Sequence, residues 1–313
     1  MRTRKQRWRP GPWQLALIAL AVFGAALGWL YWRQRAAFGN DAPSLLAALP
    51  VDRATTLYID AALLRRAGIL ALIAGAQAAE EADYRTFVEQ TGFNYRTDLD
   101  AVAATFNPSG SYFVLLGRFQ WPRLNAYAQA QGGECRNQVC NVKDGVSGRN
   151  ISFYLLSSHV LALAANPDPW GVTSIAAGRA KSSVALPPEP AWISAPAAMA
   201  SQINGLPLAA GLLLAPVAQA ETVTVAVGPR GAGLQLRVEA LCSSPETAAT
   251  VTRRLSDSLA ALHQAVSKSS GKESRGLSGV LSTGKWEQRG ARVIGTWPLE
   301  RRFLELLISG PSE

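Results

Sequence analysis

One uncharged segment near the start of the chain limits where everything after it can fold. No charged side chain occurs between Arg9 and Arg33, where the sequence reads PGPWQLALIALAVFGAALGWLYW. As a helix, the segment 13–32 would span about 30 Å, which is the thickness of the hydrocarbon core of a bilayer. Aromatic residues of the kind that favour the membrane interface stand at its two ends: Trp13, Trp29, Tyr31 and Trp32. The segment therefore predicts a transmembrane signal anchor.

The distribution of basic residues predicts the orientation of this anchor. Only Arg33 and Arg35 follow it closely, whereas five basic residues precede it: Arg2, Arg4, Lys5, Arg7 and Arg9. This bias holds the N-terminus in the cytoplasm and sends the rest of the chain across the membrane. A signal peptide cleaved near 24–26 is the alternative, and it gives the same compartment. The Ala- and Arg-rich composition looks bacterial, so we expect a single-pass inner-membrane protein with most of its chain in the periplasm.

The same basic cluster accounts for most of the net charge of +9. Seven of the 31 basic residues lie before residue 41, which leaves 24 basic residues against 22 acidic residues in the remainder. A nearly neutral folded part lacks the basic patch that nucleic-acid-binding proteins present. We therefore expect no nucleic-acid partner. The expected contacts are the bilayer, through residues 13–32, and a protein partner or a second copy of the chain.

Two of the three cysteines, Cys135 and Cys140, lie close together in the stretch ECRNQVC. On a helix their side chains would point apart, whereas a hairpin with a four-residue loop would bring them face to face. The glycines before the pair and Asn137 within it favour a turn. In an oxidising compartment this pattern predicts a structural disulfide, with free thiols as the alternative. A metal or redox site is disfavoured, because there is no C-x-x-C and no further ligand nearby. Cys242 is expected to be a small buried residue.

Two stretches of the chain share one pattern of elements. In each, two alternating apolar segments flank a Gly/Pro turn and are followed by an amphipathic helix, at 102–131 and at 223–266. A second hairpin follows in both, and each is trailed by a helical segment, at 168–180 and at 298–309. We interpret this as a duplicated unit of about 130 residues. Successive hairpins with helices on one face predict antiparallel α+β domains, ferredoxin-like in style.

The predicted organisation has five regions. They are a basic cytoplasmic tail (1–12), the transmembrane anchor (13–32), a juxtamembrane linker (33–48), a first α+β domain (49–184) and a second α+β domain (185–313). The boundary between the two domains is placed in the Pro-rich stretch ALPPEPAW. The predicted fold class is therefore α+β, with a transmembrane helix followed by two tandem antiparallel-sheet domains.

The chain offers few residues for catalysis or for metal binding. Its only histidines, His159 and His263, have no Cys, Asp or Glu at ligand or relay spacing. There is no nucleophile elbow, and the glycine-rich GPRGAG stretch precedes a strand and not the helix that a phosphate loop requires. We therefore expect no catalytic residue, no metal and no cofactor. The remaining enzymatic route is a pair of carboxylates brought together by folding, and the candidates are Asp60, Glu80, Glu81, Asp98 and Asp100.

Several local motifs resemble those of a known class of protein. They are the opening LP…YID, the strand-to-helix step GRFQWPRLNAY from Gly117 to Tyr127, and the closing WPLERRFLELL. Over most of residues 45–311 the chain resembles uncharacterised bacterial single-pass proteins with a duplicated α+β extracytoplasmic domain. The resemblance implies the architecture and assigns no catalytic residue.

These observations favour a membrane-anchored extracytoplasmic protein that acts as a non-catalytic interaction or assembly module of the cell envelope. One alternative is an inner-membrane scaffold subunit of a pilus or secretion machine. Another is a ligand-binding protein, or a hydrolytic enzyme that depends on carboxylates, with its site between the two domains. That site would require a deep pocket with converging carboxylates of raised pKa.

Overall fold

The computed structural model describes residues 41–51, 54–70, 82–143, 148–175, 186–200, 215–231, 233–268 and 277–299. All of them belong to the compact unit Asn40–Glu313. The predicted anchor, its interfacial aromatic residues and its basic flank lie outside the described residues. None of the helices in these ranges has the length and apolar character needed to span a bilayer.

The described chain is an α+β fold built on one antiparallel sheet of twelve strands. In chain order, the strands before residue 185 are β1 (Thr55–Ile59), β2 (Leu99–Asn107), β3 (Gly110–Gly117), β4 (Glu134–Arg136), β5 (Val139–Lys143), β6 (Asn150–Ser157) and β7 (Val160–Asn166). The strands after it are β8 (Ala191–Pro196), β9 (Thr222–Arg230), β10 (Gly233–Leu241), β11 (Lys285–Arg289) and β12 (Arg292–Leu299).

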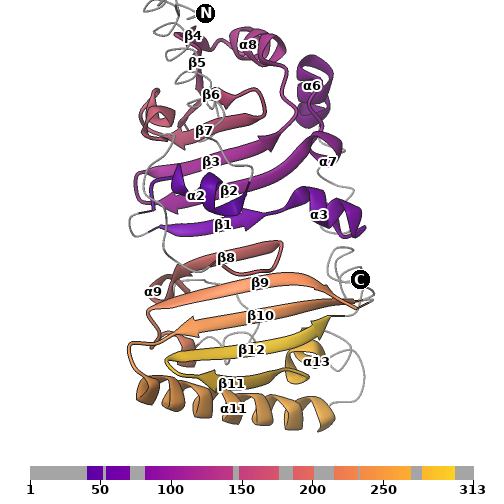
Figure 1. Cartoon of the computed structure of the whole chain (residues 1–313), viewed down its shortest axis with the longest axis vertical. Coiled ribbons are helices and arrows are strands. Elements are labelled where there is room, and N and C mark those ends of the chain that lie inside the picture. Colours follow the sequence, from indigo (N-terminus) through magenta and orange to yellow (C-terminus); the bar gives the residue numbers. More distant parts are fainter. Residues whose placement is uncertain are drawn as a thin grey trace, which may run out of the picture. The chain divides into compact units, whose positions relative to one another are not determined.

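The two halves of the sheet meet where β1 pairs with β8 (Figure 1). Outward from that pair the order is β1-β2-β3-β7-β6 on one side and β8-β9-β10-β12-β11 on the other, so equivalent hairpins occupy equivalent places. The first half then continues with β5 and β4. Because one sheet runs from β1 directly into β8, the predicted division into two domains near residue 185 stays a prediction.

Local sequence explains where the strands reverse. At the β2–β3 turn the Asn107 side chain accepts hydrogen bonds from the backbone N–H groups of Ser109 and Gly110, at 3.0 and 3.1 Å. This confirms the predicted NPSG turn. The predicted GPRG turn is displaced, because β9 extends through Arg230 and the chain reverses at Gly231, whose φ is +58°. Glycine adopts this left-handed conformation without the steric cost that a Cβ brings.

Helices cover the sheet and connect its hairpins. They are α2 (Ala42–Ala47), α3 (Ala61–Arg66), α6 (Ala82–Thr91), α7 (Tyr95–Asp98), α8 (Trp121–Ala130), the 3₁₀ turn η1 (Gly171–Ser174), α9 (Ala197–Ala200), α11 (Pro245–Lys268) and α13 (Leu277–Ser282). The long helix α11 begins as its sequence predicts. The Ser244 hydroxyl accepts a hydrogen bond from the Thr247 backbone N–H at 3.2 Å, and Pro245 occupies the first turn.

Two predicted helices differ from the structure. Within 168–180 the described residues form only the short turn η1. The Val172 N–H donates a hydrogen bond to the Ser152 hydroxyl, which holds this segment against β6. Within 298–309, Pro298 and Leu299 belong to β12, and the remaining residues lie outside the described part of the chain.

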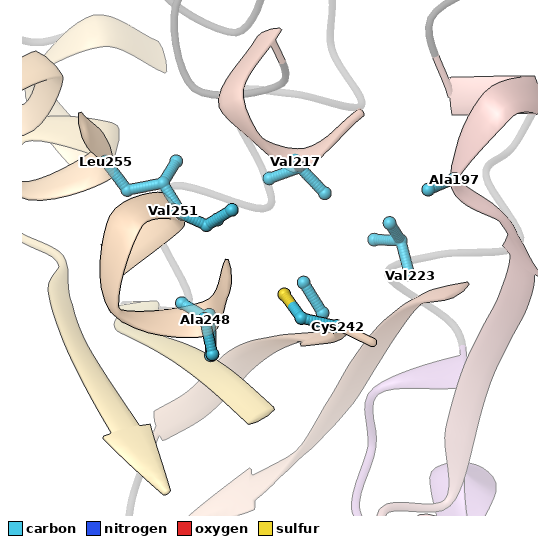
Figure 2. Close-up of a cluster of buried hydrophobic side chains, with 9 residues drawn as sticks. Ala197, Val217, Val223, Cys242, Ala248, Val251 and Leu255 are labelled. Atoms are coloured by element: carbon cyan, nitrogen blue, oxygen red, sulfur yellow. The ribbon is translucent and has the colours of Figure 1, made fainter. Parts of the chain in front are cut away.

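Among the described residues, three clusters of buried side chains hold the sheet to its helices. Figure 2 shows the first, in which Val251 and Leu255 of α11 pack toward Val223 and Cys242 from the second half of the sheet. The second joins the two halves, because Leu64 and Ile69 of the first half are buried together with Leu234 and Leu299 of the second. The third packs α8 on β5, β6 and β7 through Leu124, Ala128, Cys140, Phe153 and Leu161. The core is therefore continuous across the junction of the halves.

Candidate functional site

Of the carboxylates that the sequence offers for catalysis, Glu80 and Glu81 lie outside the described residues, and the other three each have a structural partner. Asp60 is the N-cap of α3, since its Oδ1 accepts the Leu63 N–H at 2.7 Å. Asp100 forms an ion pair with Arg65 at 2.9 Å, and Asp98 forms one with Arg118 at the same distance. The predicted enzymatic site required carboxylates of raised pKa, but the pKa of Asp98 is lowered. The three side chains therefore serve a helix cap and two ion pairs.

Asp98 does line a hollow in the surface, with a volume of about 250 Å³. Four parts of the chain build it, namely the end of α6, the end of α7, the step from β3 into α8, and the turn between β6 and β7. Its lining residues are Gly92, Asp98, Arg118, Phe119, Gln120, Ser158 and His159. Figure 1 shows α6 and α7 beside the end of the sheet at which β3 terminates. We call this hollow the Arg118 pocket.

Backbone contacts fix the wall of the Arg118 pocket. The N–H of Gly117 donates to the carbonyl of His159 at 2.9 Å, and the N–H of Arg118 donates to the carbonyl of Asp98 at 2.9 Å. Gly117 is needed here because a Cβ at this position would lie 2.4 Å from the carbonyl oxygen of Asp98. The backbone segments at Asp98, at Gly117–Arg118 and at His159 therefore lie in direct contact, which fixes the positions of their Cα atoms around the pocket.

In the ion pair of the pocket, both carboxylate oxygens of Asp98 accept hydrogen bonds. Arg118 donates to Oδ1 through Nε at 3.2 Å and through Nη2 at 2.9 Å, while Oδ2 accepts the Asn94 backbone N–H at 2.9 Å. Nη2 also contacts the carbonyl of Thr97. Burial alone would raise the pKa of Asp98, but the Asn94 hydrogen bond and the Arg118 charge outweigh it and lower the pKa. Asp98 thus stays ionised and keeps Arg118 in place.

The lowered pKa of Asp98 predicts how stability depends on pH. Its contribution is fully present above the unfolded pKa, which is about 3.9, and is lost as the pH falls through the lower folded pKa. Asp98→Asn should therefore lower the free energy of unfolding by about 1 kcal/mol at pH 7. The deficit should shrink toward zero near pH 2, as measured by urea titration at both pH values. A deficit of the same size at both would contradict this account.

The predicted disulfide is present between Cys135 and Cys140, and Cys242 is free and buried, as predicted. The two bonded residues face each other across β4 and β5, with their Cα atoms 4.0 Å apart. The loop is shorter than the four residues expected, because only Asn137 and Gln138 form it. Both have positive φ values, of 50° and 68°, as in the tightest hairpins. The disulfide joins the outermost strand β4 to its neighbour β5 and packs against α8.

Removing this disulfide should weaken the fold without abolishing it. The closed loop is short, so the double variant Cys135→Ser/Cys140→Ser should lose about 2 kcal/mol of unfolding free energy. The comparison is a urea titration of the variant against the unreduced wild type, with Cys242→Ala as a control that leaves the bridge intact and keeps the buried position apolar. A loss above about 5 kcal/mol would show that the bridge does more than restrict the unfolded chain.

A second polar feature crosses the other half of the sheet. Arg237 of β10 pairs with Glu189 at 3.4 Å and with Glu239 at 2.6 Å, and Glu239 also pairs with Arg292 of β12. The side chains of Glu189, Arg237 and Glu239 are only 17–26% exposed. Two glutamates and two arginines balance in charge and partner one another. The cluster therefore ties β10 and β12 to the segment before β8.

Only some of the residues that line the Arg118 pocket were predicted as candidates from the sequence. Asp98 and His159 were singled out, and His159 lies exposed in the β6–β7 turn. Arg118, Gln120 and Ser158 were missed as site residues, although GRFQ belongs to a quoted motif. His263 lies exposed on α11 and does not line the Arg118 pocket. Among the described residues, no group of three His, Cys, Asp or Glu side chains is placed to hold a metal ion.

Comparison with known proteins identifies no family. No family model matches the chain, and no curated protein matches it. Among solved structures, crystal form I of TP0453 aligns with a TM-score of 0.45 and 12% identity, covering 84% of this chain and 95% of that one. Crystal form IV of TP0453 gives 0.44 and 12%, with 85% and 95% covered. A similarity this distant identifies neither a family nor a function.

Proposed function

We propose that this protein is a membrane-anchored extracytoplasmic module of the bacterial cell envelope that acts by binding and not by catalysis. The observation that carries the proposal is the disulfide between Cys135 and Cys140, since disulfides persist in oxidising compartments and are rare in the cytosol. The uncharged segment 13–32, with more basic residues before it than after it, supplies the route to that compartment.

The anchor is proposed as a single transmembrane helix with its N-terminus in the cytoplasm. Trp13 would mark one interface, and Trp29, Tyr31 and Trp32 the other. The folded part would then stand in the periplasm, where a protein partner or a second copy of the chain would bind it. Nothing in this proposal calls for a nucleic acid, because the residues after the basic tail are nearly neutral in charge.

The folded part is proposed to consist of two related domains that arose by duplication. The matching strand order outward from the β1–β8 pair supports this. So does the placement of an amphipathic helix after each second hairpin strand, α8 after β3 and α11 after β10. In this proposal the sheets of the two domains join through the β1–β8 pair, and the buried cluster around Leu64 and Leu234 packs across that junction.

Reporter fusions test the proposed topology. A phosphatase that is active only in the periplasm should be active when fused after residue 45 or after residue 299. A fluorescent protein that matures only in the cytoplasm should stay dark at both positions. The variant that exchanges Arg2, Arg4, Lys5, Arg7 and Arg9 for neutral residues should lose this uniform orientation, because the charge bias then reverses. Cytoplasmic activity of the unaltered fusions would refute the proposal.

Crosslinking in native membranes then tests the binding role. The wild-type protein should be recovered with a defined partner or as a crosslinked dimer, and the yield should survive removal of nucleic acid by nuclease. Recovery of the monomer alone, after crosslinking with both short and long reagents, would argue against an assembly role.

A further inference from the structure

The Arg118 pocket holds more polar groups than its own contacts use. Arg118 gives Nε and Nη2 to Asp98, whereas its Nη1 donates to no atom of the described residues. No described residue accepts or donates a hydrogen bond to the side chains of Gln120 or Ser158, or to the imidazole ring of His159. All three side chains are exposed. They come from two different turns, so the pocket presents several free donors around one concave surface.

The charge of the pocket is positive. Asp98 and Arg118 balance, and Arg123 adds a second guanidinium at the rim, since its Nη1 lies 2.7 Å from the place of a Cβ on Gly92. Gly92 has a φ of +71°, and any side chain there would meet Arg123. The two guanidiniums of Arg118 and Arg123 outnumber the one carboxylate of Asp98, so the pocket favours a ligand with a negative charge. Because Nε and Nη2 of Arg118 are taken by Asp98 and the Thr97 carbonyl, the guanidinium offers the two N–H groups of Nη1 to an acceptor such as a carboxylate oxygen.

One wall of the pocket is apolar. Phe119 lines it, and the ring of Phe119 is stacked on Phe93, with centroids 5.0 Å apart and planes inclined by 19°. Phe93 is in turn in edge contact with Phe87 of α6, at 6.4 Å. A ring supported in this way offers a fixed surface for an apolar group. The volume of about 250 Å³ lies below the usual range for drug-sized ligands, so the pocket suits one end of a ligand.

We infer that the Arg118 pocket binds a carboxylate that carries a neighbouring apolar group. The carboxylate lies between Arg118, Gln120 and the Ser158–His159 turn, and the apolar group packs against Phe119. Two sources supply this chemistry, a small organic acid or the C-terminal carboxylate of a polypeptide. The inference deepens the proposed binding role by naming its ligand class. It does not depend on the compartment, because it is tested on purified protein.

Calorimetric titration of the full-length protein in detergent micelles tests the inference, with N-acetyl-phenylalanine as the probe. We expect a dissociation constant of about 1 mM for the acid and binding at least about tenfold weaker for its methyl ester, which lacks the charge. Arg118→Gln should weaken binding of the acid by about tenfold or more. Gln120→Ala and Ser158→Ala, which leave the ion pair intact, should each weaken it by about threefold to tenfold. Arg65→Gln is the matched control, because it breaks the Arg65–Asp100 pair outside the pocket and should leave the affinity unchanged.

The acetylated tripeptide Ala-Ala-Phe, with a free or an amidated C-terminus, separates the two sources. Tighter binding of the free-acid peptide than of the amino-acid probe assigns the pocket to polypeptide C-termini. Binding of the amino-acid probe without the peptide assigns it to small organic acids. Equal affinity for the acid and its ester would overturn the inference. So would wild-type affinity in both Arg118→Gln and Gln120→Ala, or no heat of binding up to about 20 mM in folded wild-type protein. If the titration shows no binding but the reporter fusions are active in the periplasm, this inference fails and the proposed topology stands.

Discussion

Trp297→Ala is expected to lower the free energy of unfolding by about 3–5 kcal/mol. Trp297 of β12 is only 2% exposed, and its indole Nε1 donates to the Leu281 carbonyl of α13 at 2.8 Å. It meets the ring of Trp286 edge-on, with centroids 5.0 Å apart. The surrounding chain is shaped for it, since a Cβ at Gly284 would lie 2.0 Å from its Nε1. Truncation therefore leaves a large cavity together with an unpaired carbonyl.

The matched control for this prediction is Trp297→Phe. It keeps most of the apolar volume and loses the hydrogen bond, so it should cost clearly less, about 1–2 kcal/mol. The measurement is urea unfolding of the full-length protein in micelles, followed by far-UV circular dichroism. Equal losses in the two variants would show that the hydrogen bond, and not the packing, dominates. A loss below about 1 kcal/mol for alanine would contradict the burial of this side chain.

Leu57→Pro is expected to cost about 3 kcal/mol or more and to separate the two halves of the sheet. Leu57 lies in the middle of β1, opposite Ala104 of β2 and Ile193 of β8. Since β1 is paired on both sides, its N–H groups belong to sheet ladders, and proline removes one of them and clashes with the neighbouring backbone. The β1–β8 ladder has only four opposed pairs, so it tolerates little damage.

Hydrogen exchange resolves where this damage falls. In Leu57→Pro, amides of β1, β2, β8 and β9 should exchange faster than in the wild type, while those of β6 and β7 should be least affected. Leu57→Val keeps the N–H and the apolar side chain and is the control that should preserve protection throughout. Uniform loss of protection over all twelve strands would instead mean that the halves unfold as one unit.

Features that depend on contacts between residues close in the sequence could be predicted, and features that depend on distant residues could not. The hairpins follow from alternating apolar residues and turn formers, and the start of α11 follows from Ser244 and Pro245, because these signals act within a few residues. The disulfide follows from the spacing of the two cysteines together with the predicted compartment. The pairing of β1 with β8 joins residues more than 130 positions apart and leaves no local signal. The continuous sheet was therefore beyond the sequence patterns.

The Arg118 pocket shows the same limit. Asp98 was a candidate, but the turn at Ser158 and His159 reaches it only because β7 pairs with β3, which pairs with β2. A motif such as GRFQ gives no indication that its arginine meets an aspartate 20 positions earlier. Local sequence does explain the caps that position the segment, since Asn94 accepts the Arg96 N–H and donates its own N–H to Asp98. The site is thus made of local devices brought together by long-range strand order.

The central position of β1 has a consequence for biogenesis. Because the chain is synthesised from its N-terminus, β1 is made early, and its partner strand β8 follows more than 130 residues later. Throughout that interval the first half exposes an unsatisfied row of backbone donors and acceptors, ready to recruit a strand from any neighbouring chain. Newly synthesised molecules should therefore be prone to aggregation until residues 191–196 arrive, and truncation before residue 191 should yield aggregates.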